Sequence, residues 1–165
     1  MASLAIYPGS FDPVTFGHLD VMKRATKIFN KVIVAVADNS QKKPLFTGQE
    51  RVSMLKETTK GIKGLEIEVF GGLVIDFARK KKTHVLIRGL RMFSDFEYEL
   101  QMALTNRRLD GSIETIFLMP SEGYSFLSSS LLKEAALLGA DISSFVPALI
   151  SQRLKAKLGV PERKI

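Results

Sequence analysis

Hydrophobic residues along the chain gather in short runs that alternate with longer amphipathic stretches. The run over residues 31–37 is almost entirely aliphatic, which is typical of a strand buried on both faces of a parallel sheet. Similar runs predict strands over residues 4–7, 65–70, 84–87 and 112–119. A helical pattern separates each strand from the next, so we expect right-handed crossover connections and a parallel sheet.

The stretches between these strands carry apolar residues at helical spacing. Over residues 17–29 the apolar stripe consists of Val21, Met22, Ala25, Ile28 and Phe29. Thr47 and Glu50 have the spacing of a capping box, which predicts the start of a second helix. The remaining helices are expected over residues 73–82, 94–108, 128 to about 139, and 146–158.

The helix expected from Ser94 has two distinct faces. Its predicted core face carries Phe96, Leu100, Ala103 and Leu104, and its other face carries Asp95, Glu99, Met102 and Asn106. Ser94 and Glu97 have capping-box spacing, so we interpret Asp95 and Glu97 as capping residues. Glu99 and Asn106 lie further along the helix and are candidates for contacts with a ligand.

These elements predict an α/β fold. We expect a single Rossmann-like, doubly wound domain over residues 1–165, with a five-stranded parallel sheet and helices on both faces. Residues 159–165 would form a tail after the last helix. Ligands of such sheets bind at the carboxyl ends of the strands where the strand order reverses. In the usual order, that crevice lies between the first and fourth strands.

Composition restricts the chemistry that the chain can perform. With 45% hydrophobic and 25% charged residues, it resembles an ordinary soluble globular protein. It has no cysteine, which excludes disulfides, thiolate metal sites and a cysteine nucleophile. The two histidines, His18 and His84, offer little material for a zinc site. No apolar run is long enough to span a bilayer and no signal peptide is recognisable, so we expect a cytoplasmic protein that makes no use of a membrane.

The formal charge of +7 is compatible with binding to nucleic acid, to an anionic membrane or to small polyphosphates. Many of the cations lie in residues 79–82 and 153–164. Both groups end helical patterns, where cations complement the negative end of the helix dipole, so we interpret them as solvated helix ends. Binding to nucleic acid is disfavoured because the chain lacks aromatic platforms and a recognition motif.

Residues 7–18, Tyr-Pro-Gly-Ser-Phe-Asp-Pro-Val-Thr-Phe-Gly-His, join the first strand to the first helix. The prolines and the glycine favour a fixed turn. The turn ends at a helix start, where unpaired backbone N–H groups attract anions. We interpret it as a phosphate site with His18 at its mouth, and the alternative is a capped turn with an exposed histidine. The common phosphate loops, GxxxxGK[ST] and GxGxxG, do not occur in the chain.

Other loops at the same edge of the sheet add cations. Arg88 and Arg91 follow the fourth strand and face the same expected crevice as His18. Arginine forks suit bidentate contacts to phosphate, so we favour this role over a structural ion pair. Lys42 and Lys43 follow the second strand, and we interpret Lys43 as solvated.

A run of serines begins the helix after the fifth strand. Ser128, Ser129 and Ser130 could cap this helix or donate hydrogen bonds to phosphate oxygens. A catalytic serine is not expected, because no GxSxG motif occurs and no third member of a triad is evident.

Taken together, these segments resemble bacterial phosphopantetheine adenylyltransferases. The family belongs to the nucleotidyltransferase superfamily with the [TH]xGH signature, which is Thr15-Phe16-Gly17-His18 in this chain. Beyond the first turn, the resemblance rests on Lys42-Lys43-Pro44, Arg88-Gly89-Leu90-Arg91, Asp95-Phe96-Glu97-Tyr98-Glu99, Asn106-Arg107 and Ser128-Ser129-Ser130 with Lys133-Glu134. Ser10 replaces the more frequent threonine and Leu127 replaces isoleucine. These changes keep the hydroxyl and the apolar contact.

The resemblance implies transfer of an adenylyl group from ATP to 4'-phosphopantetheine, giving 3'-dephospho-CoA and pyrophosphate in coenzyme A biosynthesis. The acceptor phosphate would attack directly, without a covalent enzyme intermediate. The resemblance implies ATP contacts at Ser10, Phe11, His18, Gly89, Leu90, Arg91, Glu99, Tyr124, Ser125, Phe126, Leu127, Ser128, Ser129 and Ser130. The acceptor would meet Ser10, Lys42, Leu73, Val74, Arg88, Met102 and Asn106.

By the same resemblance, His18 stabilises the transition state with help from Lys42, Arg88 and Arg91. Mg²⁺ would arrive with ATP rather than on protein side chains. The resemblance also implies a homohexamer, with dephospho-CoA as product and coenzyme A as a candidate feedback ligand. The alternative is another nucleotidyltransferase of the same superfamily, acting on a different phosphorylated acceptor.

Overall fold

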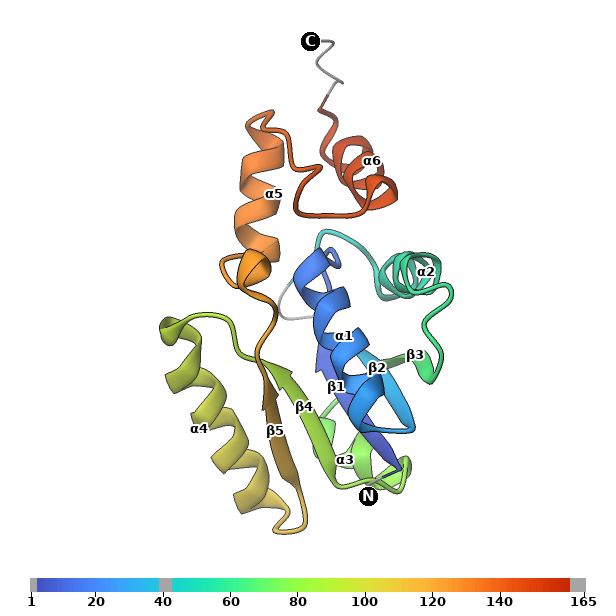
Figure 1. Ribbon diagram of the computed structural model, residues 1–165, viewed down its shortest axis with the longest axis vertical. Helices are drawn as coiled ribbons and strands as arrows, with labels where there is room; N and C mark the ends of the chain where they lie inside the picture. Colours follow the sequence, from blue (N-terminus) through green and yellow to red (C-terminus); the bar gives the residue numbers. More distant parts are fainter. Residues whose placement is uncertain (1–2, 39–42, 161–165) are drawn as a thin grey trace.

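The computed structural model describes residues 3–38 and 43–160 and has a five-stranded sheet at its centre (Figure 1). All neighbouring strands pair in parallel, in the order β3-β2-β1-β4-β5. The strands are β1 (Leu4–Gly9), β2 (Lys31–Ala37), β3 (Leu65–Phe70), β4 (Val85–Gly89) and β5 (Glu114–Leu118). The expected doubly wound α/β fold is therefore confirmed, with β1 and β4 adjacent where the strand order reverses.

Six α-helices connect and follow the strands of the described chain. They are α1 (Phe16–Ile28), α2 (Gly48–Thr58), α3 (Val74–Lys80), α4 (Phe93–Leu109), α5 (Ser129–Leu137) and α6 (Ala148–Leu158). Their bounds differ from the expected ones by a few residues. The difference that matters for the site is at β4, which continues through Arg88 and Gly89, so that Arg88 is part of the strand rather than of the loop after it.

Alternate residues of the central strands enter two separate hydrophobic cores. Val32, Val34 and Val36 of β2 pack in the core that also contains residues of α1, α2, α5 and α6. Ile33 and Ala35 point to the other face, where they pack with residues of α3. This period of two explains why the β2 sequence is aliphatic at nearly every position, because both of its faces are covered.

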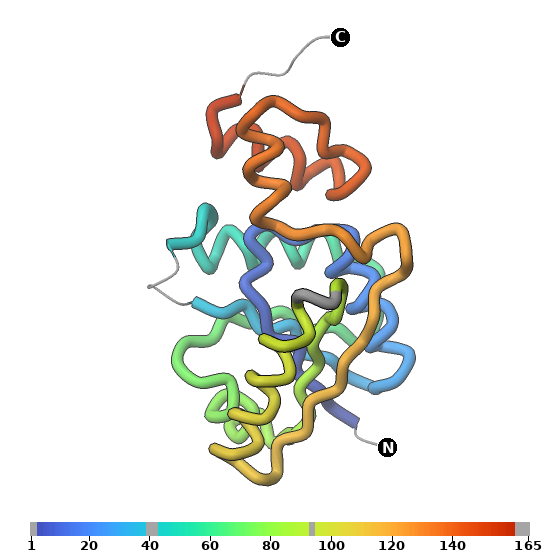
Figure 2. Tube along the Cα trace, turned by 90° about the vertical axis from the view of Figure 1, so that its left-hand side faces the viewer, coloured from blue at the N-terminus to red at the C-terminus, as the bar shows by residue number. Residues whose placement is uncertain are grey.

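Helices α5 and α6 form an upper tier beyond the carboxyl ends of the strands (Figures 1 and 2). Two ion pairs join α6 to α2: Arg153 lies 2.6 Å from Glu57, and Lys157 lies 2.8 Å from Glu50. In Figure 2 the segment after β5 rises along the edge of the molecule into α5. This arrangement brings the start of α5 to the same edge of the sheet as the loops after β1 and β4. No helix within the described ranges is long and apolar enough to cross a membrane.

Two expectations for α4 are wrong. The helix begins at Phe93 with Met92 as its N-cap residue, so Ser94 does not occupy the N-cap position that the expected capping box requires. The expected core stripe is also exposed, with Phe96 at 41% and Leu104 at 54% of full exposure. Among the side chains of α4 that the structure describes, Glu99 is the buried one, because the face that carries it is turned toward β4.

Candidate active site

A cavity of about 390 Å³ opens at the carboxyl ends of β1 and β4. It brings together eleven of the residues expected at the site, namely Ser10, Phe11, His18, Arg88, Gly89, Arg91, Glu99, Leu127, Ser128, Ser129 and Ser130. These residues come from the turn after β1, the first turn of α1, the end of β4 and the residues after it, α4, and the start of α5 with the residues before it. The expected meeting of a histidine and two arginines at the switch point is therefore found in the structure.

Other expected site residues lie outside the lining of this cavity. In the described chain these are Leu73, Val74, Leu90, Met102, Asn106, Tyr124, Ser125 and Phe126. Leu73 and Val74 lie at the start of α3, and Met102 and Asn106 lie further along α4 than Glu99. The N–H of Leu90 donates to the carbonyl of Leu118, which continues the pairing of β4 with β5. Lys42 lies outside the described residues.

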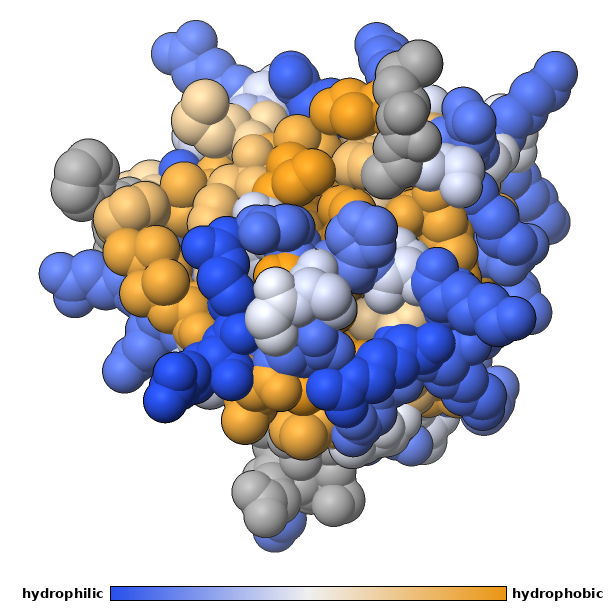
Figure 3. Space-filling model, turned by 90° about the horizontal axis from the view of Figure 1, so that it is seen from below, coloured by the Kyte–Doolittle hydropathy of each residue, from blue (hydrophilic) through white to orange (hydrophobic). Residues whose placement is uncertain are grey.

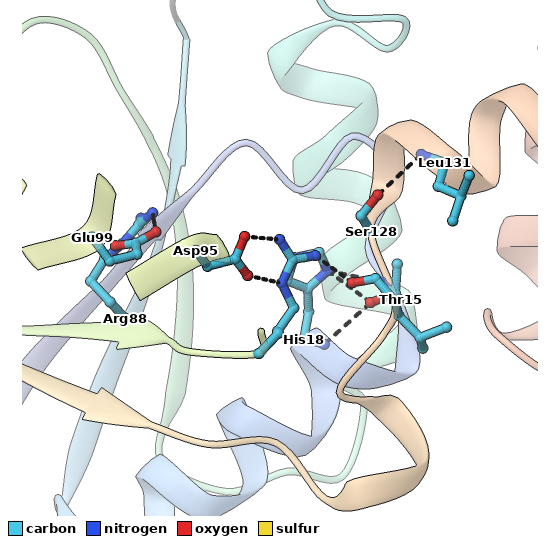
Figure 4. Close-up of polar contacts among 9 residues, drawn as sticks. Thr15, His18, Arg88, Asp95, Glu99, Ser128 and Leu131 are labelled. Carbon is cyan, nitrogen blue, oxygen red and sulfur yellow. Dashed lines mark hydrogen bonds and ion pairs between the residues drawn. The ribbon is translucent and has the colours of Figure 1, made fainter. Parts of the chain in front are cut away.

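His18 belongs to a reciprocal cap at the start of α1 (Figure 4). The backbone N–H of Thr15 donates to His18 Nδ1 over 3.1 Å, and the His18 N–H donates to Thr15 Oγ1 over 3.3 Å. Because Nδ1 accepts a hydrogen bond, the neutral ring carries its proton on Nε2. A capped turn and a histidine at the mouth of the site were alternatives for this stretch of sequence. In the structure His18 caps the helix and also lines the cavity.

The surroundings of His18 favour its neutral form. Burial and the positive charges of Arg91 and Arg88 lower the pKa of His18 to about 3. The ring also meets Phe11 edge-on, with 5.1 Å between the ring centroids. These contacts fix a neutral imidazole whose Nε2–H is a hydrogen-bond donor at the cavity.

Arg88 is held by a bidentate ion pair with Glu99 (Figure 4). Its Nε donates to Glu99 Oε2 at 2.7 Å and its NH2 donates to Oε1 at 2.6 Å, while NH1 donates to the Pro8 carbonyl at 2.7 Å. A ligand contact was favoured over a structural ion pair for Arg88, but this residue both forms an ion pair and lines the cavity. Two of the five guanidinium N–H groups have no partner in the described chain and can donate hydrogen bonds to an anion.

Arg91 is held in a similar way by the first turn of α4. Its Nε donates to Asp95 at 3.0 Å, and its NH1 donates to the carbonyl of Leu127. Asp95 therefore pairs with an arginine and does not cap the helix, which corrects the expectation from the sequence. The contact with Leu127 joins the end of β4 to the segment that leads into α5.

The three serines are used differently. Ser128 caps α5 by accepting a hydrogen bond from the Leu131 N–H at 3.1 Å (Figure 4). Ser129 donates to the carbonyl of Pro13 at 2.8 Å. Ser130 is exposed at the cavity. Ser128 thus caps the helix and Ser129 contacts the turn after β1, and all three serines line the cavity.

Two charged residues of the cavity were not expected from the sequence, Asp12 and Lys133, which pair with each other at 2.6 Å. The position of Lys133 could have been inferred from the sequence, because it lies four residues after Ser129 and therefore on the same face of α5. The buried Arg51 was missed as well. It is only 1% exposed and donates to the carbonyls of Ser10 and Ala37, both at 2.8 Å.

Within the described ranges, no group of three or more histidines and carboxylates could hold a metal ion. The two carboxylates that line the cavity, Asp12 and Glu99, each already face a cation. The cavity therefore presents arginine, lysine, histidine and hydroxyl groups, a set of donors that suits a polyanion.

Comparisons with known proteins agree with this geometry. The family model described as cytidylyltransferase-like matches residues 6–135. A phosphopantetheine adenylyltransferase from Caldanaerobacter subterraneus subsp. tengcongensis is 54% identical over 93% of this chain and 96% of its own. The chain belongs to the phosphopantetheine adenylyltransferase family. It is thus a nucleotidyltransferase, as expected from the sequence.

Two further phosphopantetheine adenylyltransferases support this membership. The protein from Thermodesulfovibrio yellowstonii is 55% identical, with 95% of this chain and 98% of the relative covered. The protein from Desulfosudis oleivorans is 51% identical, with 94% and 93% covered. Among solved structures, a nicotinic acid mononucleotide adenylyltransferase from Plasmodium falciparum, complexed with APC, has a TM-score of 0.67 at 15% identity, covering 97% of both chains. At this identity the likeness shows the shared fold.

Proposed function

We propose that this chain transfers the adenylyl group of ATP to 4'-phosphopantetheine, giving 3'-dephospho-CoA and pyrophosphate. The observation that carries the proposal is the convergence of a neutral His18 with Arg88 and Arg91 in one cavity, in a member of this family. Such a set of donors suits two phosphorylated substrates. In a serine triad an acid orients the histidine at Nδ1, but Nδ1 of His18 accepts from Thr15. The carboxylates of the cavity lining, Asp12 and Glu99, are paired with cations instead.

The reaction needs no nucleophile from the protein. An oxygen of the acceptor phosphate attacks the α-phosphorus of ATP, and the bond from this phosphorus to the bridging oxygen of pyrophosphate breaks in line. The enzyme then has to hold two polyanions in position and stabilise the charge at the α-phosphate. The Nε2–H of His18 is our candidate for that stabilising donor, because its ring is fixed by Thr15 and neutral.

In this proposal Arg88 and Arg91 bind the phosphates of different substrates. The free N–H groups of Arg88 would bind the acceptor phosphate together with Lys42, and Arg91 would bind the nucleotide. Glu99 would act mainly by orienting Arg88, since both of its carboxylate oxygens already accept from that guanidinium. The serines at the start of α5 and the backbone of Gly89 and Leu90 would complete the nucleotide site.

Mg²⁺ enters this proposal as part of the substrate, bound to the phosphates of ATP. Hard oxygen ligands suit this ion, and it often keeps several waters while bridging phosphates. The pantetheine arm would extend from the cavity toward Leu73, Val74, Met102 and Asn106. Tyr124, Ser125 and Phe126 would lie against the nucleotide.

The test is an assay of pyrophosphate release with MgATP and a panel of acceptors. We expect release with 4'-phosphopantetheine and none with pantetheine, which lacks the attacking phosphate. Nicotinate mononucleotide, a phosphorylated acceptor of another kind, represents the alternative within the superfamily. Equal turnover of pantetheine would overturn the proposed nucleophile, and a preference for nicotinate mononucleotide would overturn the proposed acceptor.

We also propose that the protein forms a homo-oligomer, with the hexamer implied by its family resemblance, in the cytoplasm. The exposed apolar residues along α4 support this: Phe96, Tyr98, Leu100, Leu104 and Leu109. On the left of Figure 3, the side on which α4 lies in Figure 1, hydrophobic side chains gather at the surface. A second copy of the chain would remove such a surface from water.

Product and product-like ligands form the last part of the proposal. Dephospho-CoA would occupy the two subsites together, and coenzyme A would compete for them as a feedback ligand. Competition by coenzyme A against both ATP and 4'-phosphopantetheine in the same assay would support a shared site, whereas inhibition independent of both substrates would exclude it.

A further inference from the structure

The cavity contains a second pair of opposite charges that the proposed reaction does not use. Asp12 in the turn after β1 and Lys133 on α5 both line the cavity, and Lys133 Nζ lies 2.6 Å from Asp12 Oδ2. A carboxylate beside a site for polyanions weakens their binding by charge repulsion. Its presence therefore needs a reason other than direct contact with phosphate.

The carboxylate of Asp12 is almost fully buried, with 5% of the residue exposed. Its Oδ1 accepts from the N–H of Phe46 at 2.9 Å, and its Oδ2 accepts from the N–H of Leu45 at 2.9 Å as well as from Lys133. Burial alone raises the pKa of Asp12, but the hydrogen bonds from Lys133 and the two backbone groups outweigh it and lower the pKa. Asp12 is thus an anion whose hydrogen-bonding capacity is directed at protein groups.

These contacts tie together three segments that are distant in sequence. Asp12 follows Ser10 and Phe11, its backbone partners lead into α2, and Lys133 belongs to the first turns of α5. A second hydrogen bond, from Ser129 to the Pro13 carbonyl, runs beside the ion pair. The start of α5 is therefore attached to the turn after β1 at two neighbouring points.

We propose that Asp12 and Lys133 are positioning residues, whose ion pair holds the serine-bearing end of α5 against the turn that carries Ser10 and His18. The pair would set the spacing between the anion donors on these two walls of the cavity. This inference rests on the proposed adenylyl transfer. Misplacing a donor by about 1 Å can cost about a hundredfold in rate, so a contact remote from the reacting atoms can have a large effect.

The alternative is that Lys133 acts on bound phosphate simply by its charge. The two roles can be separated with the variants Asp12→Asn, Lys133→Met and their combination. Charge alone predicts tighter ATP binding for Asp12→Asn and weaker binding for Lys133→Met. It also predicts near wild-type behaviour for the double variant, whose net charge equals that of the wild type. Positioning predicts that all three lose activity in the same direction, because the ion pair is broken in each.

The experiment measures kcat, the KM of each substrate and the dissociation constant of ATP for the wild type and these variants. We expect each single variant to lose between about tenfold and about a hundredfold in kcat/KM, and the double variant to lose no more than the worse single variant. Lys133→Arg, which keeps the charge and the reach, should recover most of the activity. Amide hydrogen exchange in the first turn of α5 should be faster in Lys133→Met.

A matched control is Lys81→Met. Lys81 pairs with Glu68 at 2.5 Å and is exposed to a similar degree, 26% against 28% for Lys133, but lies away from the cavity. The Lys81→Met variant should therefore have the same kinetic constants as the wild type. A double variant with wild-type kinetics would overturn the positioning role, and so would an Asp12→Asn variant that binds ATP more tightly with full activity. If Asp12→Asn does not fold, unchanged kinetics and exchange in Lys133→Met would overturn it. Wild-type protein without pyrophosphate release would instead overturn the proposed function.

Discussion

The backbone N–H of Thr15 donates to Nδ1 of His18, and the His18 N–H donates back to Thr15 Oγ1. A capping box usually ends in Glu or Gln, whereas here a histidine takes that structural position and also lines the cavity. The same hydrogen bond that begins α1 therefore selects the tautomer with a donor at Nε2. Helix formation and the orientation of the proposed catalytic group depend on one contact.

Substitutions of His18 can therefore test the role of its Nε2–H donor in the reaction. His18→Ala removes the donor and should reduce kcat by about 10²–10³-fold, the loss typical of one oxyanion donor, with little change in ATP affinity. His18→Gln should recover part of the rate, because an amide can accept from Thr15 and donate to phosphate. Steady-state kinetics and calorimetry with ATP test this. An alanine variant with normal kcat and a raised KM for ATP would show that His18 only binds the ground state.

The depressed pKa of His18 predicts an acid-sensitive fold. Its pKa is about 3 in the folded protein, and an unfolded histidine titrates near about 6.5. Between these values the unfolded chain binds a proton that the folded protein does not, so the free energy of unfolding falls as the pH falls below about 6.5.

His18→Gln lacks this proton uptake. The stability of the wild type relative to this variant should therefore decrease between about pH 7.5 and about pH 5. Urea unfolding at both pH values and one protein concentration tests the difference. Equal changes in the two proteins would mean that His18 is protonated in the folded state.

The order of the elements and the position of the site could be predicted from the sequence because both follow from local patterns. The aliphatic residues of β2 identified a central strand, and the βαβ connections then placed the turn after β1 beside the end of β4. His18, Arg88 and Arg91 meet in the cavity for that reason.

The partners of these residues could not be predicted in the same way. Lys133 and Asp12 are 121 positions apart, and no local pattern shows that they touch. The face of α4 was misassigned because helical periodicity reveals an apolar stripe but not what covers it. Leu104 has the spacing of a core residue and is exposed in the single chain.

This exposed stripe gives a test of assembly. Leu104→Glu places a charge on the apolar surface of α4, and we expect it to lower the oligomeric state, because burying an unpaired carboxylate is costly. The matched control is Ile28→Glu at the end of α1, which is 49% exposed against 54% for Leu104. Sedimentation velocity should show a smaller species for Leu104→Glu alone. Unchanged assembly of this variant would exclude this part of α4 from the interface.

The ion pair of Arg88 with Glu99 allows stability and binding to be separated. Arg88→Met leaves the buried carboxylate of Glu99 without its partner, which should destabilise the fold by about 3 kcal/mol. Adding Glu99→Gln removes the uncompensated charge and should restore most of that stability, as measured by urea unfolding.

Binding should respond differently from stability. If Arg88 binds the acceptor phosphate, Arg88→Met and the double variant should both bind 4'-phosphopantetheine more weakly, by about 2–5 kcal/mol, while ATP affinity changes far less. Arg91→Met should show the reverse preference, since Arg91 lines the cavity where it contacts the segment leading to α5, which carries the proposed nucleotide contacts. Calorimetry with each ligand distinguishes the two. Similar losses for both ligands in both arginine variants would mean that the arginines form one undivided anion site. Recovery of acceptor binding along with stability in the double variant would mean that Arg88 only supports the fold.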